Sequence, residues 1–481
     1  MSSLRKTTVS GLVWTFSQQF GVQLISFGIT IILARLLAPS EFGLIAMLTV
    51  FMAAGSVLVD GGLSSSLIRS DAVTQRDYST VFFFNLGGSI VIYALVYSLA
   101  PYIAHFYKQE ILISVIRVYA IVFVMNAFYE IQNARLTKAM NFKIQTIIQI
   151  PAVLAGGLLG VIMAMQGYGV WSLVWMNILQ SFLITVFHWV LSGWRPSLIF
   201  DKSSFKTHFN FGYKMTLSGL LEILYKNIYV LIIGKNYSAT QLGYYSRADS
   251  LSQLPTGNIA TAMNKVTYPM FASISQDNIR LKVVYKKLMQ QVIFWNAACL
   301  VLLYVIAEPL FRFLITDRWL PAVPYFKILC IAGILYPLHA YNLNILKVKG
   351  RSDLLLKLEG IKKTISIAGI FCVIPFGIYG LLYFQLLFNV VACYINSFYS
   401  GKMINYPVKE QLKDILPTLI LSAATGIVCH FLDIFLQHNL HLPDLGRLLI
   451  DSFTFFTVYL GFSHLAQLDA IYDFKQLILR R

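Results

Sequence analysis

The chain has 481 residues, is 57% hydrophobic and 12% charged, and carries a formal net charge of +17. Soluble globular proteins carry about 25% charged residues, whereas here mostly apolar stretches long enough to cross about 30 Å of hydrocarbon recur along the chain. The composition therefore excludes an ordinary soluble enzyme and predicts an all-α, polytopic membrane protein. The five cysteines stand singly in apolar segments without a CxxC pair, which argues against a metal site or a disulfide framework.

The first predicted element is an uncleaved membrane helix. Arg5 and Lys6 precede an apolar run at residues 11–34, which is longer than the roughly 7–15 apolar residues of a signal peptide. Thirteen further spans follow it, so we expect about fourteen transmembrane helices. Their approximate bounds are 11–34, 42–60, 79–101, 111–130, 147–166, 168–191, 212–234, 241–264, 284–307, 321–345, 360–376, 378–400, 415–436 and 447–467.

The basic residues predict the orientation of these spans. With the N-terminus in the cytoplasm, the inside segments hold 28 Lys and Arg residues and the outside segments hold six. The six outside residues are Arg35, Lys108, Lys235, Arg312, Arg318 and Arg447. Because Lys and Arg favour cytoplasmic loops, both termini are expected in the cytoplasm. The positive charge then faces anionic membrane lipid, and no nucleic-acid partner is expected.

An internal repeat predicts how the spans are grouped. Three pairs of similar segments occur in the same order, at offsets of 200, 211 and 208: 35–43 with 235–243, 133–139 with 344–350, and 169–173 with 377–381. Because each repeat would contain six spans, both halves have the same orientation, which is a parallel repeat. We therefore expect an N-lobe at residues 1–200, a C-lobe at 201–402 and two additional spans at 403–481.

Several of these segments resemble those of a known transporter family. They are Ala34-Arg35-Leu36-Leu37 with Glu41-Phe42-Gly43-Leu44, residues 60–68, Ala134-Arg135-Leu136 with residues 140–143, and Leu242-Gly243-Tyr244-Tyr245 running to residues 268–271. Together with the 6+6+2 plan, they resemble the Wzx-type polysaccharide flippases of the multidrug/oligosaccharidyl-lipid/polysaccharide exporter superfamily. The similarity is strongest to the colanic-acid-exporter subgroup, and it extends through the twelfth span.

The resemblance implies a function and a location. Members of this family move undecaprenyl-pyrophosphate-linked oligosaccharide repeat units from the cytoplasmic to the periplasmic leaflet of the bacterial inner membrane, by alternating access. A protein is needed because a pyrophosphate and many hydroxyls cannot enter hydrocarbon without a large desolvation cost. The implied partners are this lipid-linked substrate, membrane lipid and, in the same pathway, a polysaccharide polymerase and glycosyltransferases. No cofactor is implied beyond coupling to H⁺ or Na⁺.

Ionisable residues within spans are functional candidates, since charge at membrane depth is costly. Four basic residues fall there and could form a cationic cleft for a pyrophosphate: Arg117, Lys226, Arg247 and Lys327. The alternative is that they reach the outer interface or pair inside the bundle. Two acids, Asp249 and Glu222, are the candidates for ion coupling. Glu222 and Lys226 also have the i,i+4 spacing of an ion pair, which favours a structural role for that acid.

Polar residues form stripes on two predicted spans. In the eighth span they recur on one helical face: Ser246, Ser250, Gln253, Gly257, Thr261 and Asn264. Pro255 should kink this helix. The first span carries a shorter stripe that includes Gln19 and Gln23. We expect both stripes to line a polar cavity; the alternative is hydrogen bonding between helices.

Other functions are compatible with a polytopic helical protein. One is an ion-coupled multidrug or cation extruder of the same fold, although a cationic cleft disfavours cationic cargo. Another is a membrane polysaccharide polymerase or ligase, which would require a catalytic carboxylate pair, a DxD-type metal site or a large outer loop. The sequence contains no DxD, no P-loop and no long outer loop. A transporter is therefore expected.

Overall fold

The computed structural model describes the backbone of residues 2–472 and the side chains of residues 14–257 and 267–472. The described residues form helices and no strand, as predicted. The chain consists of two compact units, residues 1–243 and 244–481, and the residues of each unit contact mainly one another. Within the part of the chain that the structure describes, eleven helices are long and apolar enough to cross a membrane, or twelve if one bent pair is a single span. The chain is therefore an all-α protein with about eleven to twelve apolar spans.

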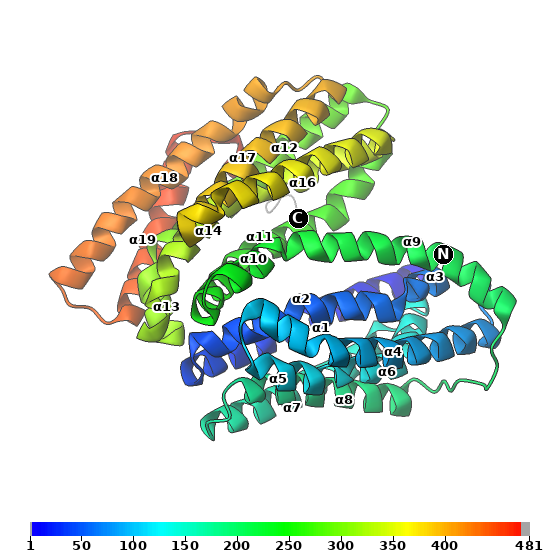
Figure 1. The fold of residues 1–481 in the computed structure, drawn as a ribbon. Helices are drawn as coiled ribbons and strands as arrows, with labels where there is room; N and C mark the ends of the chain where they lie inside the picture. The colour runs from blue at the N-terminus through cyan, green and yellow to red at the C-terminus, as the bar shows by residue number, and fades with distance from the viewer. Residues whose placement is uncertain (1, 473–481) are drawn as a thin grey trace. The chain divides into compact units, whose positions relative to one another are not determined.

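The first unit holds ten helices and the beginning of an eleventh. They are α1 (Ser2–Leu36), α2 (Pro39–Asp60), α3 (Leu63–Arg69), α4 (Gln75–Tyr107), α5 (Ile111–Tyr119), α6 (Ile121–Lys138), α7 (Phe142–Met165), α8 (Val170–Leu191), α9 (Lys202–Lys226), α10 (Ile228–Asn236) and α11 (Ala239–Ser273). Helices α4, α6, α8 and α7 pack in succession, and α1 packs on α7 (Figure 1).

The second unit contains the remainder of α11 and all later elements. They are α12 (Asn278–Val305), α13 (Ala307–Ile315), the 3₁₀ helix η1 (Asp317–Ala322), α14 (Val323–Gly333), α15 (Tyr336–Val348), α16 (Ser352–Val373), the 3₁₀ helix η2 (Ile374–Phe376), α17 (Gly377–Met403), α18 (Val408–His438) and α19 (Asp444–Leu465). Helix α12 packs on α18, which also packs on α19, and α17 packs on α14, α15 and α16.

Helix ends in the first unit follow from local sequence chemistry. Thr74 caps α4 through a capping box, in which its backbone N donates to Asp77 Oδ2 over 2.7 Å. Asp201 caps α9 by accepting from the backbone N atoms of Ser203 and Ser204, at 2.7 and 2.9 Å. Helix α2 ends at Gly61, whose φ of 58° is the left-handed conformation that glycine adopts readily.

Helix breaks interrupt several of the predicted spans, including the tenth, which divides into η1, α14 and α15. The fourth divides at Ala120 into α5 and α6, and the seventh bends by 50° between α9 and α10. The eleventh and twelfth are one apolar stretch of 52 residues interrupted by η2. Gly377, with φ 78°, begins the helix after this interruption. Helix α11 continues past Pro255, and the described part of this helix contains no stretch apolar enough to be recognised as a span.

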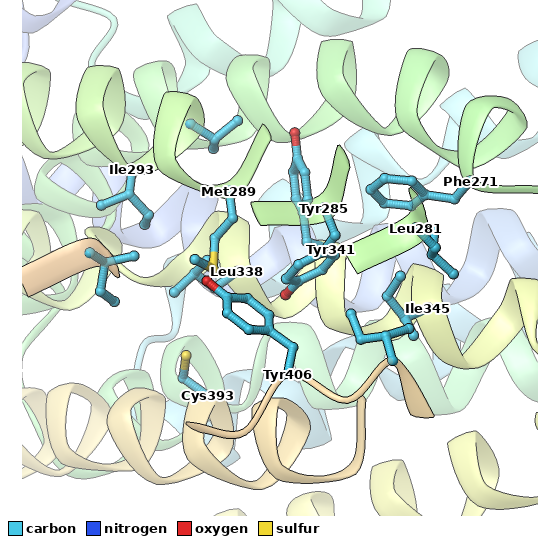
Figure 2. Packing of buried hydrophobic residues seen from close by; sticks show 13 residues of the cluster. Phe271, Leu281, Tyr285, Met289, Ile293, Leu338, Tyr341, Ile345, Cys393 and Tyr406 are labelled. Atoms are coloured by element: carbon cyan, nitrogen blue, oxygen red, sulfur yellow. The ribbon is translucent and has the colours of Figure 1, made fainter. Parts of the chain in front are cut away.

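The core of the second unit combines aromatic packing with a buried hydrogen-bond network. Phe271, Tyr285 and Tyr341 form edge and tilted contacts with centroids 6.0–6.3 Å apart (Figure 2). Tyr285 Oη donates to Asn342 Oδ1 at 2.7 Å, and Asn342 Nδ2 donates to Ser397 Oγ at 3.0 Å. Because unpaired polar groups are expensive away from water, this network fixes the register of α12, α15 and α17.

The loop between α17 and α18 is anchored to the same core. Tyr406 is fully buried against Tyr285, with ring centroids 5.9 Å apart (Figure 2). Its hydroxyl donates to Asp414, which also pairs with Lys286 at 2.8 Å. Burial, and then the hydrogen bond to Asp414, raise the pKa of Tyr406 well above its usual range, so this hydroxyl keeps its proton.

The first pair of repeated segments is in direct backbone contact. A Cβ added to Gly43 would overlap the carbonyl of Ala239, and one added to Gly243 would overlap the carbonyl of Pro39. All four residues belong to the first unit. The contact is reciprocal at the offset of 200 seen in the sequence. Glycine is thus required at both positions by close helix approach, which is a steric demand rather than a conformational one.

We predict that Gly43→Ala and Gly243→Ala each destabilise the protein, by the roughly 1–3 kcal/mol typical of overpacking. Gly87→Ala is the matched control, because a Cβ at this helical glycine meets no atom within 4 Å. It should be neutral or slightly stabilising, since Ala favours helix by up to about 1 kcal/mol over Gly. Thermal unfolding of the purified variants in detergent measures the difference. Equal melting temperatures for all three would contradict the close approach.

Candidate functional sites

The first unit contains a cavity of about 610 Å³ between α4, α5 and α8. Arg117 of α5 lines it together with Tyr93 and Tyr97 of α4 and Trp175 of α8. The Arg117 guanidinium lies over the Tyr97 ring, with Cζ 4.4 Å from the ring centroid, and its Nε donates to the Tyr97 carbonyl at 3.5 Å. Cation–π contact of this kind orients a guanidinium while leaving most of its N–H groups available.

The chemistry of this cavity suits an amphiphilic anion. It offers one guanidinium, the hydroxyl of Ser114 and three aromatic rings, with apolar side chains such as Ile113 completing the wall. A guanidinium binds phosphate oxygens in a two-pronged geometry, and aromatic faces pack against sugar rings or acyl chains. The carboxylate of Glu110 also borders the cavity, so the arrangement has one cation and one acid.

The second unit contains a smaller polar cavity of about 120 Å³ beside Asp249. Asp249 and Gln253 of α11 line it and are hydrogen-bonded to each other. Gln385 and Asn389 of α17 lie opposite, and the Gln385 Oε1 atom is buried without a hydrogen-bond partner. Tyr336 of α15 completes the polar lining.

Oxygen atoms dominate the donor set of this cavity. The described residues contain no group of three or more His, Cys, Asp or Glu that could hold a metal ion. With one carboxylate and several amide or hydroxyl oxygens, the Asp249 cavity matches a proton or a hard monovalent cation. The orphaned Gln385 oxygen is the observation that points to an occupant, because a buried acceptor without a donor costs free energy.

Gln385 and Asn389 were not among the residues predicted from the sequence. They are two amide residues at i,i+4 spacing on one face of α17, inside an otherwise apolar run. Their i,i+4 spacing could have identified them as cavity residues, because polar residues within spans usually face the interior of a helix bundle. Asn389 Nδ2 donates to the carbonyl of Ala332 at 3.3 Å and thereby ties α17 to α14 beside the cavity.

The other predicted basic residues have separate surroundings. Arg247 is half-buried on α11, and its guanidinium lies over the fully buried Trp319 ring at 5.9 Å. Lys327 is half-buried on α14, with its Nζ 5.3 Å from the Tyr304 ring centroid. Within the second unit, neither residue lines the Asp249 cavity. Both therefore make cation–π contacts at the positions where the sequence predicted anion binding.

Lys226 and Glu222 form the ion pair that their spacing predicted. The Nζ–Oε1 distance is 2.7 Å, at the end of α9, and both side chains are largely exposed. An exposed pair of this kind contributes little to stability.

The two predicted polar stripes differ in their surroundings. On α1, Gln19 is exposed and Gln23 half-buried, whereas the neighbouring Gln18 donates to Gln149 Oε1 of α7 at 2.8 Å. On α11, Ser250 and Gln253 are exposed and only Gln253 reaches the cavity, while the Ser246 hydroxyl is buried without a hydrogen-bond partner. The side chain of Asn264 lies outside the described residues.

Comparison with known proteins identifies the family. The profile of the family described as "Polysaccharide biosynthesis protein" matches residues 32–324. The chain belongs to this family. It is 25% identical to the teichuronic acid biosynthesis protein TuaB of Bacillus subtilis, with 91% of each chain aligned. It is 26% identical to the lipopolysaccharide biosynthesis protein WzxC of Escherichia coli, with 89% of each aligned.

Solved structures show the same fold. The lipid II flippase MurJ, in an inward closed conformation, superposes with a TM-score of 0.74 at 13% identity, covering 96% of this chain and all of that one. An inward-facing MATE family transporter of the MOP superfamily superposes with a TM-score of 0.62 at 15% identity, covering 80% of this chain and 94% of that one. The predicted exporter-superfamily resemblance is thus confirmed for the family and the fold.

Proposed function

We propose that this chain is a flippase of the bacterial inner membrane, a transporter rather than an enzyme, that carries undecaprenyl-pyrophosphate-linked oligosaccharide repeat units from the cytoplasmic to the periplasmic leaflet. Membership of the polysaccharide biosynthesis family carries the proposal. The relatives support it by name, since two serve teichuronic acid and lipopolysaccharide biosynthesis and a third, ExoT of Rhizobium meliloti, is a succinoglycan biosynthesis transport protein.

The mechanism we propose is alternating access between two lobes. Fourteen crossings are obtained if α11 spans the membrane and if α16 and α17 are counted separately. The parallel repeat then gives lobes at residues 1–200 and 201–402, with α18 and α19 at 403–481 as an addition. Packing supports a bipartite chain but places span seven, α9 and α10, with the first unit. No cofactor is involved; the partners are the lipid-linked substrate, membrane lipid and, in the pathway, a polymerase and glycosyltransferases.

Direct transport measurement tests the function. Proteoliposomes containing the purified chain would receive a polyprenyl-diphosphate oligosaccharide, and an impermeant lectin would report how much is exposed on each leaflet. Active protein should equilibrate or concentrate the lipid across the bilayer, and empty liposomes should not. Extrusion of a cationic dye without lipid movement would instead support the multidrug alternative, and covalent extension of the oligosaccharide would support a polymerase or ligase.

The orientation can be tested at two exposed acids. Asp317 at the start of η1 and Asp353 at the start of α16 have side chains that are 75% and 66% exposed. We predict that an impermeant thiol reagent labels Asp317→Cys in intact cells, and labels Asp353→Cys only after lysis. A cysteine-free background is needed because the native Cys372 is exposed. The reverse labelling would invert the proposed topology.

The cation site can be tested at Asp249 and Gln385. We predict that Asp249→Asn reduces gradient-driven transport about tenfold or more, because hydrogen bonds to a charged group are worth about 1.5–3 kcal/mol. Gln385→Leu should also reduce gradient-driven transport, because it removes the oxygen that has no hydrogen-bond partner. Ser250→Ala is the control on the same helix, since Ser250 does not line the cavity. Transport that keeps its full dependence on the H⁺ or Na⁺ gradient in Asp249→Asn would exclude this coupling site.

Substrate recognition can be tested at Arg117 and Arg247. We predict that alanine at either position lowers surface polysaccharide without lowering membrane abundance, because each removes a guanidinium that we propose contacts the diphosphate. Lysine should restore activity only in part, since it lacks the planar fork. Arg351→Ala is the control, because Arg351 pairs with exposed Asp353 at 2.9 Å outside both cavities. Normal polysaccharide levels in Arg117→Ala or Arg247→Ala would remove that residue from the binding site.

A further inference from the structure

The helix pair α18–α19 contains a buried charge cluster that none of the proposed transport sites uses. Its centre is Arg447, which the positive-inside count places in an outer loop but which is only 1% exposed. Arg447 Nε donates to Asp433 Oδ1 and its Nη2 to Asp433 Oδ2, both at 2.8 Å. Two parallel bonds of this kind form the strongest guanidinium–carboxylate geometry. This pair links the end of α18 to the beginning of α19.

Other oxygens complete the coordination of Arg447. Its Nη2 also donates to Gln437 Oε1 at 3.2 Å, and its Nη1 donates to Asp444 Oδ1 at 3.4 Å. Asp444 in turn lies 3.6 Å from Arg312 of α13, which pairs with Glu308 and Asp317. At this end of the cluster Arg312 thus pairs with three partly exposed carboxylates, whereas Arg447 has its donors directed at Asp433, Gln437 and Asp444.

A second carboxyl group lies inside this network without a counter-ion. Asp451, one helical turn after Arg447, is 0% exposed, and neither of its oxygens has a hydrogen-bond partner. It lies within hydrogen-bonding reach of the Asp433 carboxyl group. The Cys429 thiol of α18 is its other titratable neighbour. Cys429 belongs to a buried hydrophobic cluster that also includes Phe455 and, from α12, Phe294.

The charges of this inner cluster do not balance if both acids are ionised. One guanidinium would then face two carboxylates, and Asp451 would be a buried anion without a donor. Two close carboxyl groups avoid this by sharing one proton, because like charges a few ångströms apart cannot both persist in a low-dielectric environment. The proton would belong to the pair rather than to either residue.

We propose that Asp433 and Asp451 together bind one proton at neutral pH and that this proton joins α18 to α19. The protonated carboxyl of Asp451 donates to Asp433, whose other interactions are the two bonds from Arg447. When the proton leaves to water, two carboxylates face one guanidinium and the contact between the helices weakens. The site is independent of the Asp249 cavity and of the proposed transport function.

The proton makes the folded state sensitive to pH in a defined direction. In an unfolded chain an aspartate releases its proton well below neutral pH, so the folded state binds one more proton than the unfolded state. Stability must then fall as pH rises over the range between the pKa of an unfolded aspartate and the pH at which the folded pair ionises. With one proton released, the unfolding equilibrium constant rises about tenfold for each pH unit within that range.

The experiment compares thermal unfolding of the purified full chain in detergent from mildly acidic to mildly alkaline pH. Wild type should lose melting temperature as pH rises. Asp451→Asn should show a flatter profile, because the amide can donate to Asp433 as the protonated acid does but cannot titrate. Asp444→Asn is the matched control, since Asp444 also contacts Arg447 but is partly exposed. It should keep the pH dependence of the wild type.

Infrared spectroscopy of the wild type provides a second test. It shows whether the carboxyl pair holds a proton even if Asp451→Asn does not fold. A protonated carboxylic acid gives a C=O stretch separate from the carboxylate bands, and this signal should be present at neutral pH and disappear as pH rises. A wild type without this signal, or with stability independent of pH, would overturn the proposal. Stability that follows Na⁺ concentration at fixed pH would also overturn it, because the occupant would then be a metal cation.

Discussion

The structure depends on one constraint: a polar group within the hydrocarbon must find its partner inside the protein. The backbone satisfies this constraint by forming helices along nearly the whole described chain. Side chains satisfy it through networks such as Tyr285–Asn342–Ser397. Because most polar groups are paired, the few that are not become informative, and the Gln385 oxygen and the Asp451 carboxyl group are two of them.

Most of the fold could be predicted because hydropathy and positive charge report directly on membrane crossing. The fourteen predicted segments fall on helices, and the all-α class is confirmed. Three features could not be predicted. The breaks at Ala120 and Asn227 carry no proline, and α9–α10 packs with the first unit although the sequence assigns it to the start of the second predicted repeat. These features follow from tertiary packing, which the local sequence does not encode.

Candidate site residues could be predicted from the sequence where a charged residue stands alone within an apolar run. Arg117 and Asp249 are recognisable as charges within apolar runs, and both line cavities. Other residues that line the same cavities come from distant segments and are amides or aromatic rings, such as Gln385 and Trp175, which are common in membrane helices. The burial of Arg447 could not be predicted, because it lies near a predicted span end, where a charge normally reaches water. In the structure, a carboxylate on the neighbouring helix satisfies it instead.

The glycine contact between residues 39–43 and 239–243 has the geometry of a symmetric dimer interface. In such an isologous contact, residue i meets j while j meets i, and here Gly43 faces Ala239 while Gly243 faces Pro39. In an assembly of two identical halves, every substitution at this contact would occur twice, once on each side. In one continuous chain each side can mutate alone, yet both positions still hold glycine. The crossing thus has a local two-fold relation that matches the offset of 200 between the two sequence segments.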